Sequence, residues 1–134
     1  MQPMVQGSKY RYLLDLPGIS GTTWDSLNWK MASGALVFKV TTTSMNWWHP
    51  FLTPGEDYLP VHTNLSNLHD QDVWAEAHLR DAQRIAGRGR LKALHFGRQD
   101  VQDAYHDQLF NRMNEPAVDV FADFPLGFPP VSWA

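Results

Sequence analysis

Hydrophobic and polar positions divide the first forty residues into two short apolar runs with a polar segment between them. The apolar runs are Tyr10–Leu16 (YRYLLDL) and Ala35–Val40 (ALVFKV), and both are typical of strands. Between them, Pro17–Trp24 is rich in small and hydroxyl residues, which predicts a turn that leads into a helix over Asp25–Ser33. The pattern therefore predicts a β-turn-α-β unit.

The ends of this first helix have their own signals. Thr23 or Asp25 is a candidate N-cap, and Gly34 is the expected C′ residue. Further along, Met45–Leu52 predicts a short helix that is broken at Pro50.

The next segment predicts a turn, a third strand and another helix. Pro54-Gly55 is a turn signal, and Asp57–Val61 (DYLPV) reads as a short strand in which Pro60 indicates an edge or a strand end. Asn64 or Ser66 is then expected to cap a helix. The apolar face of that helix is expected to come from Leu65, Leu68, Val73 and Trp74.

Two longer helices follow. The run Arg80–Leu94 is predicted to be helical, although Gly87 and Gly89 weaken it by about 1 kcal/mol each relative to alanine. Its apolar residues are Ile85, Leu91 and Leu94. The run Asp100–Met113, with Asp100 as the candidate N-cap, has an apolar face at Val101, Tyr105 and Leu109. We expect residues 1–113 to form one domain and residues 114–134 to form an irregular tail rich in proline and aromatic residues.

The order of these elements favours an α/β fold with a parallel sheet in three layers, of the Rossmann-like kind. Only about three strands are visible, so the sheet is expected to be incomplete. In such folds a turn from a strand into a helix can cradle a phosphate with its backbone N–H groups. The turn over Pro17–Trp24 fits that role, and an ordinary strand-to-helix connection is the alternative.

Composition and charge narrow the functional classes. The formal charge of −3 gives no general attraction to nucleic acid, and we expect neither a nucleic-acid partner nor a membrane-spanning run. The basic residues Arg84, Arg88, Arg90 and Lys92 are interpreted as a solvated helix face. Six histidines lack metal-site spacing, so no metal is expected, and neither G-x-S-x-G nor G-x-G-x-x-G occurs.

Four ordered blocks of sequence resemble one known family. The blocks are Lys9–Asp15 with the turn Gly18–Trp24, Trp29–Phe38, Trp47–His49 through Tyr58–Val61, and Asn64–Leu68. Together they resemble the C-terminal part of glycosyltransferase family 90, which includes capsule-associated xylosyltransferases and protein O-glucosyltransferases. The resemblance runs from Lys9 to about Phe110 and does not cover the tail.

This resemblance implies a GT-B fold of two Rossmann-like halves, of which the chain is most of the donor-binding half. It implies transfer of glucose or xylose from UDP-glucose or UDP-xylose to a hydroxyl of a protein or polysaccharide, without a metal, in the secretory pathway. A separate N-terminal acceptor half is the implied partner. The implied donor-binding residues are Gly18, Ser20, Gly21, Thr22, Thr23, Trp24, Asn28 and Lys30.

The chain departs from the family pattern in two places. Family members usually have an arginine in the helix after the turn, where this chain has Asn28 or Ser26. Lys30 could substitute, but as a point charge instead of a bidentate fork. The family's acidic catalytic base lies in the acceptor half, so no catalytic residue is assigned and the chain alone is expected to be inactive. A non-catalytic binding or assembly module with the same half-fold, and an unrelated small α/β protein, are the alternatives.

Overall fold

The computed structural model describes residues 9–18, 26–43 and 46–113 of the 134 residues. The chain divides into two compact units, one up to Gly97 and one from Arg98 onward, and each is described by itself. Most of the predicted glycine turn, both N-cap candidates (Thr23 and Asp25) and the tail 114–134 lie outside the described residues. The domain boundary after residue 113 therefore stays a prediction.

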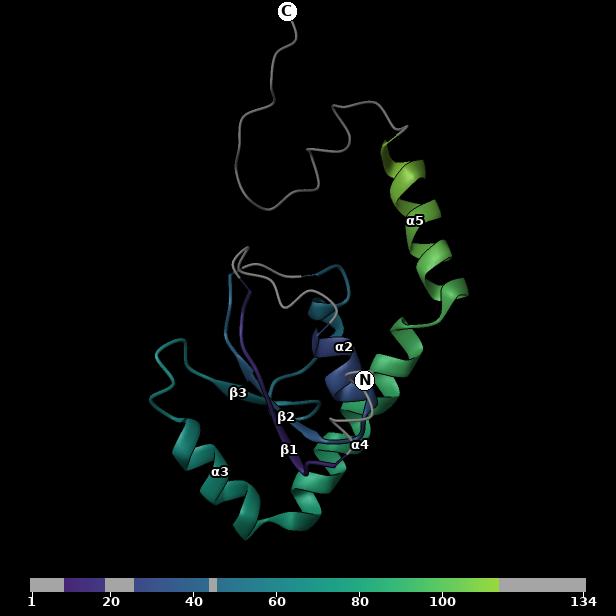
Figure 1. The fold of residues 1–134 in the computed structure, drawn as a ribbon. Coiled ribbons are helices and arrows are strands. Elements are labelled where there is room, and N and C mark those ends of the chain that lie inside the picture. The colour runs from purple at the N-terminus through teal and green to yellow at the C-terminus, as the bar shows by residue number, and fades with distance from the viewer. Residues whose placement is uncertain (1–8, 19–25, 44–45, 114–134) are drawn as a thin grey trace, which may run out of the picture. The chain divides into compact units, whose positions relative to one another are not determined.

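The first unit is built on an open parallel sheet. Its strands are β1 (Tyr12–Asp15), β2 (Leu36–Val40) and β3 (Leu59–Val61), which lie in the order β1-β2-β3 (Figure 1). The helix α2 (Ser26–Ala32) connects β1 to β2. The predicted strand-helix-strand order and the α/β fold class are thus confirmed, and β3 is an edge strand of this sheet, as Pro60 indicated.

Gly34 ends α2 in the way that the sequence predicted. Its φ is +86°, a conformation that residues with a side chain rarely adopt, and its N–H donates to the Met31 carbonyl.

Side chains on the two faces of the sheet form two separate cores. On one face, Phe38 and Val40 of β2 pack with Val61 and with residues of α3 (Leu68–Ala77) and α4 (Leu79–Phe96). On the other face, Val37 packs with residues of α2 and the neighbouring loop, including Leu27 and Met31. Alternate residues of a strand point to opposite faces, so both faces of β2 are covered. The three-layer arrangement follows.

The segment around Pro50 differs from the prediction. The described part of Met45–Leu52 contains a single 3₁₀ turn, η1 (His49–Phe51), in which Pro50 lies in the first turn. Proline is well tolerated there because the first N–H groups of a helix have no partner within the helix. Pro50 therefore starts this short element and does not break it.

The predicted caps of α3 were also wrong. The N-cap position is Asn67, whose side-chain oxygen accepts from the His62 N–H and does not cap the helix. Asn64 accepts from the Ser66 N–H in the turn before the helix. Trp74 and Leu68 pack on the core as predicted, whereas Leu65 and Val73 are exposed, so the predicted apolar face was correct in part.

The predicted helix over Arg80–Leu94 is confirmed as α4, and of its three apolar residues only Ile85 is buried. Leu91 and Leu94 are exposed, and most of the buried positions of α4 are small residues. They are Ala82, Ala86, Gly89 and Ala93. Small side chains let α4 lie close to α2 and the sheet, and this spacing outweighed the preference of leucine for burial.

The second unit contains α5 (Gln99–Met113). The helix begins at Gln99, so Asp100 lies in its first turn and is not the N-cap; its carboxylate is 2.6 Å from Arg98 Nη2. None of Val101, Tyr105 and Leu109 is buried, so the predicted buried face is not observed in this unit. Among the described residues, we find no helix with the length and apolar character needed to cross a bilayer.

Candidate functional site

The carboxyl ends of β1 and β2 lie side by side at one edge of the sheet. Asp15, the last residue of β1, is paired in register with Lys39 of β2, and Gly18 follows three residues after Asp15. Ligands of open parallel α/β sheets bind outside the carboxyl ends of the strands. This edge is therefore the candidate functional site of the described chain.

Asp15 organises the first part of the edge. Its carboxylate is fully buried, and Oδ1 accepts from Lys30 Nζ and from Ser26 Oγ, each at 2.9 Å. The other oxygen, Oδ2, has no hydrogen-bond partner among the described residues. The Lys30 ammonium is largely buried and neutralised by this pair, so its charge is already compensated inside the protein.

The structure describes three of the eight predicted donor-binding residues. Lys30 lies at the edge beside Asp15, and Gly18 is exposed just after β1. Asn28 is directed elsewhere, because its side-chain nitrogen lies near Gly97 at the end of α4. The other five predicted residues are Ser20, Gly21, Thr22, Thr23 and Trp24, and they lie outside the described residues. Their roles, like those of Lys30 and Asn28, stay predictions.

Lys39 provides a second cation at this edge. Its side chain lies on the same face of the sheet as Asp15, and its ammonium is 5.8 Å from the centre of the Tyr58 ring. Burial lowers the pKa of Lys39, and the charge of Asp15 partly offsets this effect. Lys39 forms no ion pair with any described residue, and 7% of its surface is exposed.

His49, in η1, is buried near Lys39. Its Nδ1 accepts from the backbone N–H of Asn46 at 3.3 Å. Burial, and then the charge of Lys39, lower the pKa of His49 to about 4, so the ring is neutral at pH 7 and its proton is on Nε2. That N–H has no hydrogen-bond partner within the described residues, which costs about 1–3 kcal/mol.

Lys39 and His49 line the same small cavity. Its volume is about 170 Å³, and its other walls are Thr41, Thr42, Leu52 and Tyr58. The cavity lies at the carboxyl end of β2, the strand next to β1. Sequence analysis missed this pair, although Lys39 is the one charged residue in the otherwise apolar run ALVFKV.

A larger cavity of about 430 Å³ lies at the opposite edge, where β1 and β2 begin. Its walls include Tyr10, Arg11, Gly34 and Leu79. The Arg11 guanidinium there is paired with Glu76 at 3.3 Å, and the edge is the amino end of the strands. We favour the smaller cavity because it contains Lys39, a cation with no ion-pair partner in the described part of the chain, and lies at the edge where such sheets bind ligands.

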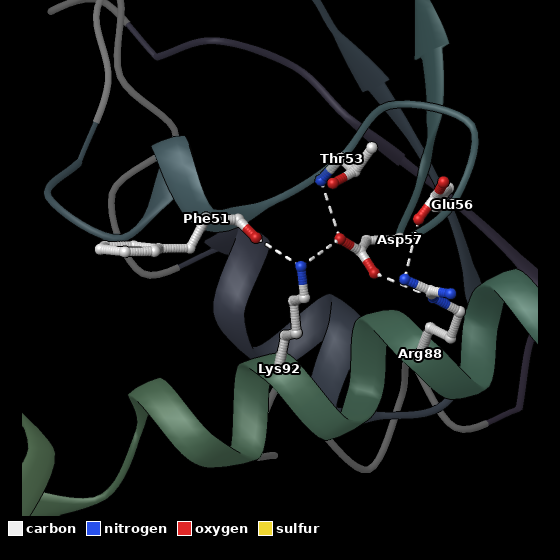
Figure 2. Close-up of polar contacts among 6 residues, drawn as sticks. All are labelled: Phe51, Thr53, Glu56, Asp57, Arg88 and Lys92. Carbon is white, nitrogen blue, oxygen red and sulfur yellow. Dashed lines mark hydrogen bonds and ion pairs between the residues drawn. The ribbon is translucent and has the colours of Figure 1, made fainter.

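A buried carboxylate fixes the walls of the smaller cavity. Figure 2 shows Lys92 and Arg88 of α4 directed toward Asp57, which comes just before Tyr58 and is 1% exposed. Lys92 Nζ lies 2.7 Å from Asp57 Oδ2, and the Thr53 N–H donates to the same oxygen at 2.8 Å. Lys92 also donates to the Phe51 carbonyl of η1. The cluster therefore ties α4 to the segment that holds His49, Leu52 and Tyr58.

The other Asp57 oxygen has an ionic partner and no hydrogen bond. Arg88 Nε lies 3.5 Å from Oδ1, and Arg88 also bonds Glu56 at 2.8 Å. Burial opposes ionisation of Asp57, but the bonds from Lys92 and Thr53 outweigh it and hold its pKa below the ordinary value. The basic residues of α4 are thus partly used for internal pairing, and Arg84 is paired with Asp81. The described residues include no group of three metal-ligating side chains.

Comparison with known proteins supports a specific family. The model of glycosyl transferase family 90 matches residues 2–115. Protein O-glucosyltransferase 1 of Homo sapiens is 34% identical over 114 residues, which cover 84% of this chain and 28% of that protein. Protein O-glucosyltransferase 1 of Bos taurus is 30% identical over 114 residues, with the same shares of the two chains covered. Protein O-glucosyltransferase 2 of Danio rerio is 27% identical over 107 residues, which cover 80% of this chain and 21% of that protein. The chain thus spans less than a third of the length of these relatives.

Proposed function

Because the chain belongs to glycosyltransferase family 90, we propose that it is the donor-binding part of a UDP-sugar-dependent O-glycosyltransferase. The proposed reaction moves a glucosyl or xylosyl group from UDP to a hydroxyl of a protein or polysaccharide. The relatives named as protein O-glucosyltransferases favour a glucosyl group and a protein acceptor. The single observation that supports the donor role most is the parallel β1-α2-β2 unit inside the matched residues.

In the proposed reaction, the donor-binding part of the protein stabilises UDP as the leaving group. When the sugar is transferred, negative charge develops on the phosphate oxygens of UDP, and fixed N–H groups and cations lower the barrier. The turn after Gly18 would supply N–H groups to the diphosphate, and no metal is proposed. The acceptor and the acidic base would be held by a second, N-terminal half in a GT-B arrangement, in the secretory pathway.

A second candidate function is a binding or assembly module that keeps this half-fold without catalysis. One observation favours it: Lys30, the substitute for the family's arginine, is neutralised by Asp15. A neutral pair attracts a diphosphate much less than a free guanidinium does. UDP binding distinguishes the two functions, because only the donor-binding part needs it.

The test is a titration of the purified chain with UDP, followed by tryptophan fluorescence. We expect a saturable change in the wild type that is lost in Gly21→Glu, because the added carboxylate would occupy and repel the diphosphate in the turn. Gly87→Glu is the matched control, since a side chain at Gly87 meets nothing within 4 Å. If the folded wild type shows no fluorescence change at millimolar UDP, the donor role is wrong. The binding or assembly module is then the favoured function.

A further inference from the structure

Counted over the described residues, the positive charge at the carboxyl edge exceeds the negative charge near it. Two ammonium groups, Lys30 and Lys39, face the single carboxylate of Asp15. Lys30 forms the ion pair, at 2.9 Å, and Lys39 does not approach any described carboxylate within ion-pair distance. Asp57, the other buried carboxylate of the described core, is already paired with Lys92 and Arg88. Among the described residues, one buried positive charge, that of Lys39, is therefore left without an anion.

A hydrogen-bond donor without a partner lies in the same cavity. The His49 ring is 94% buried, because only 6% of its surface is exposed, and its Nε2 has no partner among the described residues. The Asn46 N–H holds Nδ1 as an acceptor, so Nε2 is the protonated nitrogen. A buried donor without a partner is uncommon in a finished site, and a ligand that accepts a hydrogen bond would satisfy it.

From this placement we infer that Lys39 and His49 form a subsite for a phosphate group of the nucleoside diphosphate donor. The inference rests on the proposed function for the identity of the ligand. An anionic oxygen satisfies both groups at once, because it neutralises the ammonium and accepts from the imidazole N–H. A neutral carbonyl or hydroxyl oxygen would satisfy the imidazole but leave the ammonium uncompensated.

The position of the cavity agrees with that ligand. Asp15 and Lys39 are neighbours across β1 and β2, so the cavity that Lys39 lines lies near the carboxyl end of β1, which the proposed diphosphate-binding turn follows in the sequence. A diphosphate held by the turn could place one phosphate toward Lys39. The cavity volume of about 170 Å³ admits a phosphate group, and Tyr58 and Leu52 close it on the apolar side. In this arrangement Lys39 takes the part that Lys30 cannot play while it is paired with Asp15.

Calorimetric titration of the 134-residue chain with UDP, pyrophosphate and uridine tests the subsite. The variants are Lys39→Met, His49→Phe and the exposed control Lys9→Met. We expect Lys39→Met to weaken UDP and pyrophosphate about tenfold or more, His49→Phe to weaken them severalfold, and uridine to be unaffected, because charged hydrogen bonds are lost only with the phosphates. Lys9→Met should match the wild type.

The outcomes separate the subsite from the donor role. If the wild type binds UDP and Lys39→Met binds it as Lys9→Met does, the subsite is wrong and the donor role stands. If pyrophosphate binds in a Lys39-dependent way and UDP does not bind, Lys39 and His49 bind phosphate but not that of a nucleoside diphosphate, and both the inferred subsite and the donor role fail. Binding of neither ligand by the folded wild type overturns the subsite.

A second readout uses the wild type alone, in case Lys39→Met does not fold. Pyrophosphate should shift the ¹⁵N resonance of His49 Nε2, because that nitrogen becomes a hydrogen-bond donor to the ligand. An unchanged His49 resonance at saturating pyrophosphate would contradict the subsite, whatever the variants show.

Discussion

Gly87 and Gly89 lie two residues apart in α4, and the structure predicts opposite effects when each becomes alanine. A Cβ at Gly87 would meet nothing within 4 Å, so Gly87→Ala brings only the better helix propensity of alanine, about 0.5–1 kcal/mol in the free energy of unfolding. A Cβ at Gly89 would lie 2.3 Å from the Asp57 carbonyl oxygen and 2.8 Å from Met31 Cε.

The magnitude at Gly89 follows from these distances. An ordinary contact between carbon and a carbonyl oxygen is about 3.3 Å, so α4 or the Asp57 segment must move by about 1 Å. The clashing oxygen belongs to the backbone, which the bonds of Asp57 to Lys92 and Thr53 hold in place. Overpacking of this kind costs about 1–3 kcal/mol, which exceeds the gain in helix propensity.

Urea unfolding monitored by circular dichroism measures both variants. We expect Gly87→Ala to raise the urea concentration at the unfolding midpoint and Gly89→Ala to lower it. In thermal unfolding, the midpoint temperature should move in the same directions, by roughly 4 °C for each kcal/mol of change in the free energy of unfolding. If both substitutions stabilise the chain equally, the close approach of α4 to Asp57 does not exist in solution.

Three further predictions concern the buried charges. Lys30→Met should lower the free energy of unfolding by about 3 kcal/mol, because it leaves the fully buried Asp15 carboxylate unpaired. In a double-mutant cycle, adding Asp15→Asn should recover part of this loss. If the free-energy changes of the two substitutions are fully additive, the ion pair does not contribute to stability. The pKa of Asp57 is held below its ordinary value of 3.8, so its contribution to stability is present above that pH and is lost as the pH falls through the folded pKa; Asp57→Asn should weaken this acid dependence in urea melts. The pKa of His49 is about 4, against an ordinary 6.5, so between these pH values the unfolded chain binds more protons than the folded chain. The free energy of unfolding should therefore fall by on the order of 3 kcal/mol as the pH drops from 6.5 to 4. His49→Phe should flatten this pH dependence, and an unchanged slope would show that His49 is not buried as described.

The sequence predicted the first unit well where local patterns decide the structure. The strands at Tyr10–Leu16 and Ala35–Val40, the helix between them and the C′ role of Gly34 are all observed. These features depend on short apolar runs and on the conformational freedom of one glycine, and both can be read without knowing what packs against them.

The sequence predicted less where packing between distant segments decides the structure. The buried stripe of α4 consists of small residues because α2 and the Asp57 segment come close, and no local pattern shows that distance. For the same reason, the sequence does not show that Leu91 and Leu94 are exposed. Lys39 and His49 are ten residues apart, and their shared cavity appears only when η1 folds beside β2.

The most direct test of the central claim is to map UDP binding on the ¹⁵N-labelled chain by NMR. The account predicts that UDP shifts the amide resonances at the carboxyl edge of the sheet, at Gly18, Lys39 and Thr41, and leaves those at Tyr12 and Gly34 unchanged. Shifts confined to Tyr12 and Gly34, around the larger cavity where the strands begin, or no shifts at millimolar UDP, would contradict it.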